Sequence, residues 1–337
     1  MSNHSANSVQ PLVDPLGRVH SNLRISVTDR CNIRCFYCMP EEVVFRPREE
    51  LLTFEEIERF VRAAATLGIN KLRLTGGEPL VRKGLPELVK RLAAVEGIED
   101  VALTTNGILL ADQAEALQTA GLHRLNVSLD TLYEDTFQKI SRRSGLQQVL
   151  DGIFAAQQAG FKKIRLNAIA IRGLTESEVL PLAEFARKHN LELRFIEFMP
   201  LDADGNWTSE EVLTGASIRE LLEKEIGRLQ PVERRDASQP AVDYRFTEGS
   251  GKVGFINPVS EPFCGSCNRI RITAEGQIRN CLFSTVEWDA RAVLRSNGSS
   301  EQLCQLVHDC VAAKKPAHGI GQDSFEKPAR AMYEIGG

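Results

Sequence analysis

The sequence predicts an α/β protein built as a partial (β/α)6 TIM-like barrel, followed by a smaller C-terminal region. The first observation is that six strand-like segments alternate with helix-like segments between residues 23 and 226, which is typical of a parallel sheet. The second is that most of these strands alternate polar and apolar residues, which favours a curved sheet with one polar face. The 337 residues, 42% of them hydrophobic, are enough for one large domain or two moderate ones.

Each predicted strand is followed by at least one predicted helix. Thr53 and Glu56 have the spacing of a capping box, and Gly68 can end the helix that begins after Thr53. The predicted strands cover residues 23–28, 71–75, 101–105, 124–129, 163–171 and 191–198. The other predicted helices cover about 86–95, 112–120, 133–141, 146–159, 176–189 and 216–226.

The polar residues of these strands fall on one face. In the first strand, Arg24, Ser26 and Thr28 share a face opposite Leu23 and Ile25. The same alternation places Lys71, Arg73, Asn126, Ser128, Arg165 and Asn167 on the polar faces of their strands. If the apolar faces pack against helices, the polar faces line a large interior cavity suited to a charged ligand. The alternative is an antiparallel sheet with one solvated face, which the intervening helices disfavour.

The composition changes after the sixth strand–helix unit. Residues 231–241 are polar and contain two prolines, so we place a boundary near this segment. Two short strand-like segments follow, then a hairpin over 268–283 with its turn at Glu275-Gly276, and a helix over about 300–313. We therefore divide the chain into a flexible N-terminal extension (1–14), a barrel core (15–230) and a C-terminal region (231–337).

The composition also excludes several classes of protein. The net charge of −4 provides no overall positive field for nucleic acid. No segment resembles a signal peptide, and none reaches the roughly 18 apolar residues of a membrane span. Closely spaced cysteines without a secretory signal indicate metal or redox chemistry, so we expect a cytoplasmic protein that binds neither nucleic acid nor membrane.

Six of the eight cysteines form two triads. They are Cys31, Cys35 and Cys38, after the first strand, and Cys264, Cys267 and Cys281, in the C-terminal region. Structural zinc and iron–sulfur sites normally have four protein ligands, so three thiolates leave one coordination position open for chemistry. The alternatives are a zinc knuckle with a distant fourth ligand for the first triad and a zinc ribbon for the second. Cys304 and Cys310 are helically spaced, which is more typical of core residues.

A glycine pair ends the second predicted strand, in the sequence Thr75-Gly76-Gly77-Glu78-Pro79. Glycines at such a position let a ligand approach the backbone, and Glu78 can pair with a cation there. The alternative is a plain turn.

Together, the motifs CNIRCFYC and TGGEP resemble those of the radical S-adenosylmethionine (SAM) enzymes. The stretch CGSCNRIR at 264–271, Cys281 and the final Gly336-Gly337 resemble the members of that family that act on GTP in molybdenum cofactor biosynthesis. The resemblance implies a 4Fe–4S cluster on each triad, the first binding SAM and the second binding the purine of GTP. It also implies a lyase in which a SAM-derived radical takes the 3′ hydrogen of GTP and C3′ then bonds to guanine C8.

The resemblance further implies residues that bind each ligand. For SAM these are Tyr37, Gly77, Ser128 and Met199, with Asn126 and Glu78 as weaker candidates. For GTP they are Arg24, Arg73, Thr104, Arg165, Arg269 and Arg271. A lysine is usual at position 165, so Lys163 is a competing candidate. The final two glycines are expected to reach into the active site.

Each of these residues also has a simpler interpretation. Ser128 and Asn126 could merely line a polar interior, and Met199 could be a core residue. Each arginine could be a solvated or ion-paired side chain.

The expected partners are an external one-electron donor and, downstream in the pathway, cyclic pyranopterin monophosphate synthase; a homodimer is possible. Two other functions remain open. One is a radical SAM enzyme that modifies a peptide with the help of an auxiliary cluster, and it requires neither GTP nor the arginine set. The other is a non-catalytic binding module stabilised by zinc.

Overall fold

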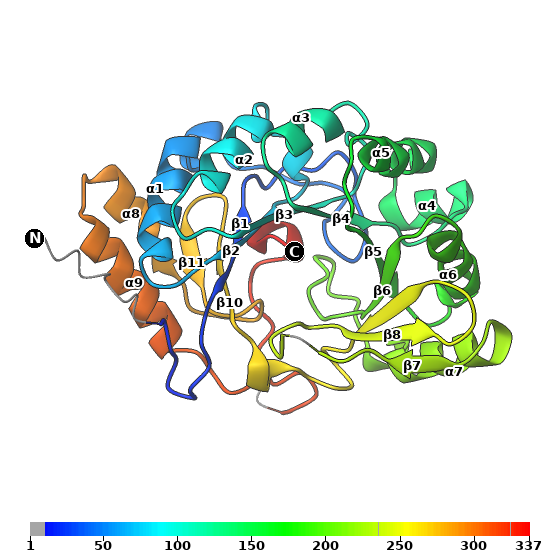
Figure 1. Cartoon of the computed structure of the whole chain (residues 1–337). Helices are drawn as coiled ribbons and strands as arrows, with labels where there is room; N and C mark the ends of the chain where they lie inside the picture. The colour runs from blue at the N-terminus through cyan, green and yellow to red at the C-terminus, as the bar shows by residue number, and fades with distance from the viewer. Residues whose placement is uncertain (1–10, 235, 324) are drawn as a thin grey trace, which may run out of the picture.

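A single curved sheet of twelve strands runs through the protein, in the order β12-β11-β10-β1-β2-β3-β4-β5-β6-β9-β8-β7. The computed structural model describes residues 11–234, 236–323 and 325–337 (Figure 1). Its central strands are β1 (Asn22–Ser26), β2 (Lys71–Thr75), β3 (Asp100–Thr105), β4 (Arg124–Ser128), β5 (Ile164–Ala170) and β6 (Glu192–Glu197). Neighbouring strands from β1 to β6 all pair in parallel, so the predicted partial barrel is confirmed and the antiparallel alternative is wrong.

The helices between these strands cover the convex side of the sheet (Figure 1). They are α1 (Phe54–Ala65), α2 (Leu85–Ala93), α3 (Ala114–Thr119), α4 (Glu134–Ser141), α5 (Leu146–Gln158), α6 (Val179–Lys188) and α7 (Gly215–Glu225). The capping box of α1 is present as predicted: Thr53 Oγ1 accepts from Glu56 N (3.1 Å) and Glu56 Oε2 accepts from Thr53 N (2.7 Å). Gly68, with φ +91°, follows the end of this helix.

The apolar faces of the strands pack under these helices. Leu23, Ile25, Leu72 and Leu74 are at most 1% exposed and belong to one large hydrophobic cluster. The register then aligns the polar residues, with Arg24 beside Arg73 and Asn126 beside Arg165. The concave side of the sheet is therefore polar, as the alternation predicted.

The C-terminal strands extend the same sheet at both edges. Here lie β7 (Leu229–Pro231), β8 (Val242–Phe246), β9 (Lys252–Ile256), β10 (Arg269–Ile272), β11 (Gln277–Arg279) and β12 (Trp288–Asp289). Strand β9 pairs in parallel with β6, and β10 pairs in parallel with β1. The predicted hairpin is β10–β11, and Gly276, at φ +91°, donates its N–H to Thr273 O in the turn. The two parts of the chain therefore share one sheet, although the boundary proposed near residue 230 stays a prediction.

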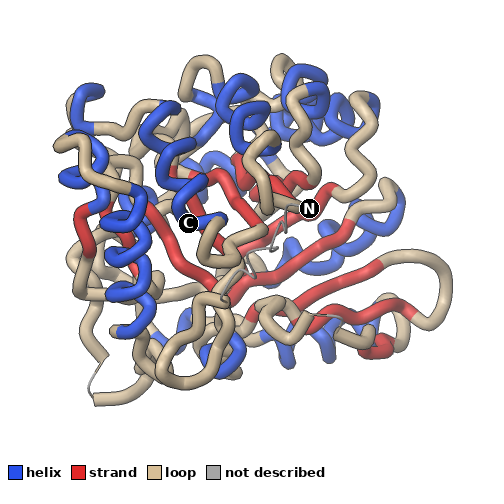
Figure 2. Tube along the Cα trace, turned by 60° about the vertical axis from the view of Figure 1, so that its left-hand side comes forward, coloured by secondary structure: helices blue, strands red, loops and turns tan. Residues whose placement is uncertain are grey.

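The remaining helices are α8 (Ala290–Arg295), α9 (Ser300–Ala312) and α10 (Met332–Ile335). The sequence predicted α9 and missed the two short helices, which have fewer than two full turns each of regular periodicity. Helix α10 lies on the concave side, in front of the strands, where the chain ends (Figure 2).

The predicted N-terminal extension packs before it reaches residue 15. Its residues 1–10 lie outside the described part of the chain, whereas Leu12 and Asp14 are 0% and 5% exposed. Leu12 N donates to Leu67 O, and Leu12 O accepts from His20 N. Within the described residues, no helix combines the length and the apolar composition needed to cross a bilayer.

Candidate functional site

The concave side of the sheet encloses a cavity of about 890 Å³, within the range of small-molecule sites. All six cysteines of the two triads line it. Every residue predicted to bind SAM or GTP lines it as well: Tyr37, Gly77, Ser128, Met199, Arg24, Arg73, Thr104, Arg165, Arg269 and Arg271. The structure therefore brings both sets of residues, which lie up to 257 positions apart in the chain, to one chamber.

The first triad lies on the loop that leaves the carboxyl end of β1. Cys35 O accepts from the N–H groups of Cys38 and Met39, at 2.9 Å each, which makes this part of the loop a tight turn. Burial raises the pKa of Cys31 to about 11, and burial together with Cys31 raises that of Cys38 further. These thiols need a bound cation to ionise, which is what a metal centre supplies.

The spacing of the cysteines distinguishes between a single metal ion and a cluster. Among the described residues, no three His, Cys, Asp or Glu side chains are close enough to hold one ion. In a 4Fe–4S cluster each thiolate binds a different iron, so the sulfurs surround the cluster without converging on one point. All six thiols are free of disulfides. Each triad thus offers three free thiols that line the cavity, the number that leaves one iron of a 4Fe–4S cluster open.

The Gly-Gly-Glu segment supports the first cysteine loop. A Cβ at Gly76 would lie 2.5 Å from Thr28 O, and one at Gly77 would lie 2.5 Å from Arg30 O. Glycine is thus needed here for the approach of the protein's own backbone, in addition to any ligand. The Glu78 carboxylate accepts from Leu80 N (2.9 Å), Thr105 Oγ1 (2.8 Å) and Asn106 N (2.6 Å), so it connects the loops that follow β2 and β3.

We expect Gly77→Ala to destabilise this loop. The added methyl group would displace the backbone at Arg30, directly before Cys31, at a cost of about 1–3 kcal/mol in unfolding free energy. Urea unfolding measures the loss, and iron content with SAM cleavage reports the first triad. Gly265→Ala is the matched control, because no described atom lies within 4 Å of its added Cβ. Equal stability of the two variants would contradict the steric role of Gly77.

Tyr37 is the SAM candidate with a defined side-chain contact. Its hydroxyl donates to Asp130 Oδ2 (2.8 Å), while Asp130 Oδ1 accepts from Ile169 N (2.8 Å). These bonds attach the first cysteine loop to the ends of β4 and β5. Tyr37 and Ser128 both line the cavity.

The second triad comes from two loops beside β10 and β11. Cys264 and Cys267 precede β10, and Cys281 follows β11. Arg269 Nε and Nη2 lie 3.4 and 3.3 Å from Cys267 Sγ. Burial raises the pKa of Cys267, but Arg269 and Lys314 outweigh it and bring that pKa down to about 6. This thiol is therefore prepared to ionise as a metal ligand.

Four arginines of the cavity have no carboxylate partner within ion-pair distance among the described residues: Arg24, Arg73, Arg269 and Arg271. Arg24 Nε is buried without any hydrogen-bond partner there. Burial and the neighbouring Arg269 lower the pKa of Arg24 to about 9, and burial with Arg24 lowers those of Arg73 and Arg271 further. A buried surplus of positive charge favours an anionic ligand.

Three other cations on the cavity wall are paired with carboxylates. Arg165 Nε lies 2.7 Å from Glu192, Lys71 Nζ lies 2.9 Å from Asp236, and Arg194 Nη2 lies 3.2 Å from Asp243. Lys163, the competitor of Arg165, is exposed at the rim.

Lys71 and Arg194 line the cavity but are not among the residues predicted to bind a ligand. The alternation of polar residues in β2 already put Lys71 on the polar side of the sheet. Arg194 pairs with Asn167 in the neighbouring strand, and this register puts it on the same side.

The end of the sequence lies in the same chamber, as expected. Gly336 O accepts from Arg271 Nη1 (2.5 Å), and Gly337 lines the cavity. Ile335, 1% exposed, anchors this tail in a small hydrophobic cluster with Leu201 and Phe283. Figure 1 shows the C-terminus inside the arch of strands.

Comparisons with known proteins agree with this geometry. The Radical SAM superfamily model matches residues 25–186, and the Molybdenum Cofactor Synthesis C model matches residues 191–320. A GTP 3′,8-cyclase of Rhodopirellula baltica is 52% identical over 330 residues, covering 97% of this chain and 92% of the relative. One of Pelotomaculum thermopropionicum is 44% identical, covering 96% and 99%.

Solved structures show the same fold at low identity. Streptococcus suis SuiB bound to S-adenosylmethionine is 15% identical with a TM-score of 0.61, covering 86% of this chain and 68% of that one. Because the sequence similarity to the cyclases is high over nearly the whole length, the chain belongs to the GTP 3′,8-cyclase family within the radical SAM superfamily.

Proposed function

We propose that the protein is a lyase that converts GTP to (8S)-3′,8-cyclo-7,8-dihydroguanosine 5′-triphosphate in molybdenum cofactor biosynthesis. The observation that carries this proposal is the set of four arginines that have no carboxylate partner in the described part of the chain and lie in one cavity with both cysteine triads. Such an arrangement provides two places for iron–sulfur clusters and a binding region for a polyanion next to them.

The chain's own residues would bind and orient two substrates. Cys31, Cys35 and Cys38 would hold one 4Fe–4S cluster, and Cys264, Cys267 and Cys281 another. When bound, these groups supply one-electron cleavage of SAM to methionine and a 5′-deoxyadenosyl radical, and an open iron for the purine. Tyr37, Gly77, Ser128 and Met199 would contact SAM from the walls that carry the first triad.

The four arginines would hold GTP at the other side of the chamber. Arg73, Arg24 and Arg271 stand side by side on β2, β1 and β10, so their guanidinium groups can bind successive phosphates. With the nucleotide fixed, its C3′ hydrogen is transferred, C3′ bonds to C8, and one electron and one proton complete the product. Positioning of both substrates and exclusion of water are the protein's contributions.

The remaining assignments are proposals of the same kind. The barrel core would supply the SAM side, and the C-terminal region would supply the second cluster. Thr104, which accepts from Arg73 Nη1 (3.2 Å), would orient that arginine. An external one-electron donor, a downstream cyclic pyranopterin monophosphate synthase and a homodimer complete the proposal.

Anaerobic incubation with reductant, SAM and GTP tests the function. We expect 5′-deoxyadenosine and the cyclised nucleotide to form together, and neither to form without SAM. Formation of 5′-deoxyadenosine with GTP unchanged would favour a peptide-modifying enzyme. Two zinc ions per chain without sulfide would favour a binding module.

We expect Arg24→Gln to weaken GTP binding. A charge-assisted hydrogen bond contributes about 1.5–3 kcal/mol, so the KM for GTP should rise about ten- to a hundredfold while SAM cleavage persists. Arg245→Gln is the control, because Arg245 lies exposed on β8 outside the cavity. An unchanged KM for Arg24→Gln would contradict the role of this arginine.

A further inference from the structure

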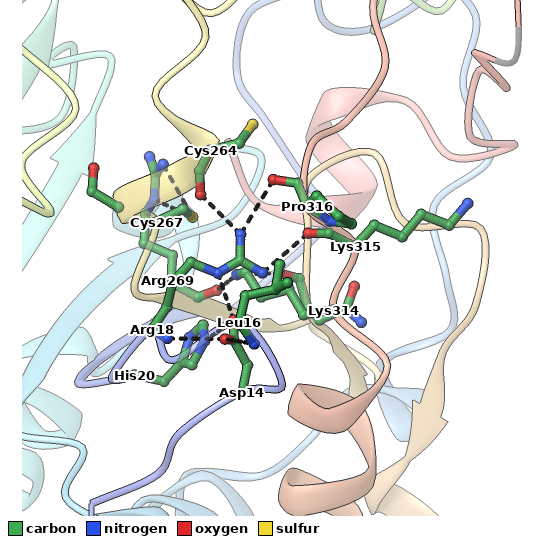
Figure 3. Close-up of polar contacts among 12 residues, drawn as sticks. Asp14, Leu16, Arg18, His20, Cys264, Cys267, Arg269, Lys314, Lys315 and Pro316 are labelled. Carbon is green, nitrogen blue, oxygen red and sulfur yellow. Dashed lines mark hydrogen bonds and ion pairs between the residues drawn. The ribbon is translucent and has the colours of Figure 1, made fainter.

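A buried polar cluster lies beside the second triad (Figure 3) and is not part of the cavity lining. Its members Asp14, Arg18 and His20 have side chains that are 0%, 6% and 0% exposed. Asp14 Oδ2 lies 2.5 Å from Arg18 Nε and 3.0 Å from His20 Nε2. Asp14 Oδ1 accepts from the N–H groups of Leu16 and Arg18, so one carboxylate fixes the position of Arg18.

Arg18 connects the N-terminal segment to the second triad. Its Nη1 donates to Cys264 O (2.9 Å) and Pro316 O (3.4 Å), and its Nη2 donates to Lys315 O (3.0 Å). One guanidinium group therefore joins the N-terminal segment to the Cys264 loop and to residues 315–316. Both of these lie more than 240 positions further along the chain. Only arginine has enough donors in a fixed plane for this arrangement.

Lys314 completes the pattern around the other two cysteines. Its Nζ donates to Arg269 O and Asn280 O, at 2.7 Å each. Arg269 is two residues after Cys267, and Asn280 directly precedes Cys281. Each cysteine of the triad thus has a backbone carbonyl, its own or that of a near neighbour, bound by a buried cation.

The two cations differ in their net effect. The charge of Arg18 is balanced by Asp14, whereas Lys314 has no carboxylate within ion-pair distance among the described residues. Lys314 is 7% exposed, so its charge is poorly screened by solvent. Net charge and hydrogen bonding near the sulfurs are the factors that set the potential of an iron–sulfur cluster.

We propose that Arg18, held by the Asp14 carboxylate that also bonds His20, and Lys314 are positioning residues for the second cluster. Arg18 fixes the Cys264 loop, and Lys314 fixes the loops of Cys267 and Cys281 and makes the cluster easier to reduce. The inference rests on the proposed function in one respect, namely that the second triad binds a 4Fe–4S cluster.

The role of Arg18 is tested by cluster retention. After anaerobic reconstitution, Arg18→Gln should lose the second cluster to a chelator about tenfold faster than the unaltered protein, since a bond of about 1.5–3 kcal/mol to the loop is lost. Arg18→Lys should recover part of this difference, and Arg245→Gln should behave as the unaltered protein. SAM cleavage by the first cluster shows that the variant is folded. Equal retention in Arg18→Gln and the unaltered protein would overturn this half of the proposal.

The role of Lys314 is tested by the reduction potential. Lys314→Met is compared with Lys315→Met, which removes the same charge from an exposed neighbour. In both variants and in the reference protein, Cys31, Cys35 and Cys38 are replaced by alanine. Only the second cluster is then reduced in a redox titration monitored by EPR. At a fixed applied potential, we expect Lys314→Met alone to lower the ratio of reduced to oxidised second cluster about tenfold. For one electron this corresponds to a midpoint potential lower by ~59 mV. An unchanged potential would overturn the electrostatic half.

The experiments distinguish failure of the proposed function from failure of the roles of Arg18 and Lys314. If the unaltered protein bound no cluster at Cys264, Cys267 and Cys281, the proposed function would fail together with this inference. If the unaltered protein bound both clusters and the Arg18 and Lys314 variants matched it, only the positioning roles would be overturned.

Discussion

Cys281→Ala should abolish GTP conversion while leaving reductive cleavage of SAM intact. Cys281 follows β11, whereas Cys264 and Cys267 precede β10, so the third ligand comes from a loop of its own. Two remaining thiolates cannot hold the cluster in place, and the purine loses its attachment. Because positioning contributes about 7–11 kcal/mol to such reactions, GTP conversion should fall by about a thousandfold or more.

The measurement compares two products in one anaerobic assay. Formation of 5′-deoxyadenosine should stay within about twofold of the unaltered protein, because the first triad lies on the loop after β1. Cys304→Ala is the matched control: its Sγ donates to Ala63 O (3.5 Å) and it lies outside the cavity. Simultaneous loss of SAM cleavage in Cys281→Ala would contradict separate roles for the two triads.

Gly336→Ala should reduce GTP conversion about a hundredfold through the tail. Gly336 has φ +84°, and a Cβ there would lie 2.6 Å from Thr75 Oγ1 and 2.9 Å from Ser26 Cβ. A left-handed alanine costs about 1–2 kcal/mol, and forcing a methyl group against this wall adds about 1–3 kcal/mol. The tail then leaves its place, and Arg271 loses the carbonyl that orients it.

Gly337→Ala provides the control for this variant. Its added Cβ would meet only Met332 Cγ and Sδ, at 2.7 and 2.8 Å, and a methionine side chain can move aside. Steady-state kinetics should therefore show a large loss of kcat for Gly336→Ala and a small one for Gly337→Ala. Equal losses of kcat in the two variants would contradict the prediction, because contact with Ser26 and Thr75 would then not explain the effect at Gly336.

The central fold was predictable because its signals are local. Most strands of the barrel alternate polar and apolar residues over five to seven positions, and the capping box of α1 depends on two residues three positions apart. The pairing of β10 with β1 was not predictable in this way, since it joins residues about 250 positions apart. Neither strand carries a local sequence signal for this pairing, which depends on how the rest of the sheet is assembled.

The sequence predicted which residues line the site better than it predicted which of them form ion pairs. Spacing and the resemblance identified all six cysteines that line the cavity and five of its arginines, but not Arg124 or Arg194. The sequence did not distinguish Arg24, which has no carboxylate partner among the described residues, from Arg165, which is paired with Glu192. Ion pairing depends on the register of neighbouring strands, here of β5 beside β6.

The parallel pairing of β1 with β10 has a consequence during synthesis of the chain. Residues 22–25 leave the ribosome long before residues 269–272, which form their outer hydrogen-bonding partner. Until then one edge of β1 is unpaired, and unpaired edges attract other strands. Completion of the sheet around β1 must therefore await the last quarter of the polypeptide, and until then this edge is open to pairing with other chains.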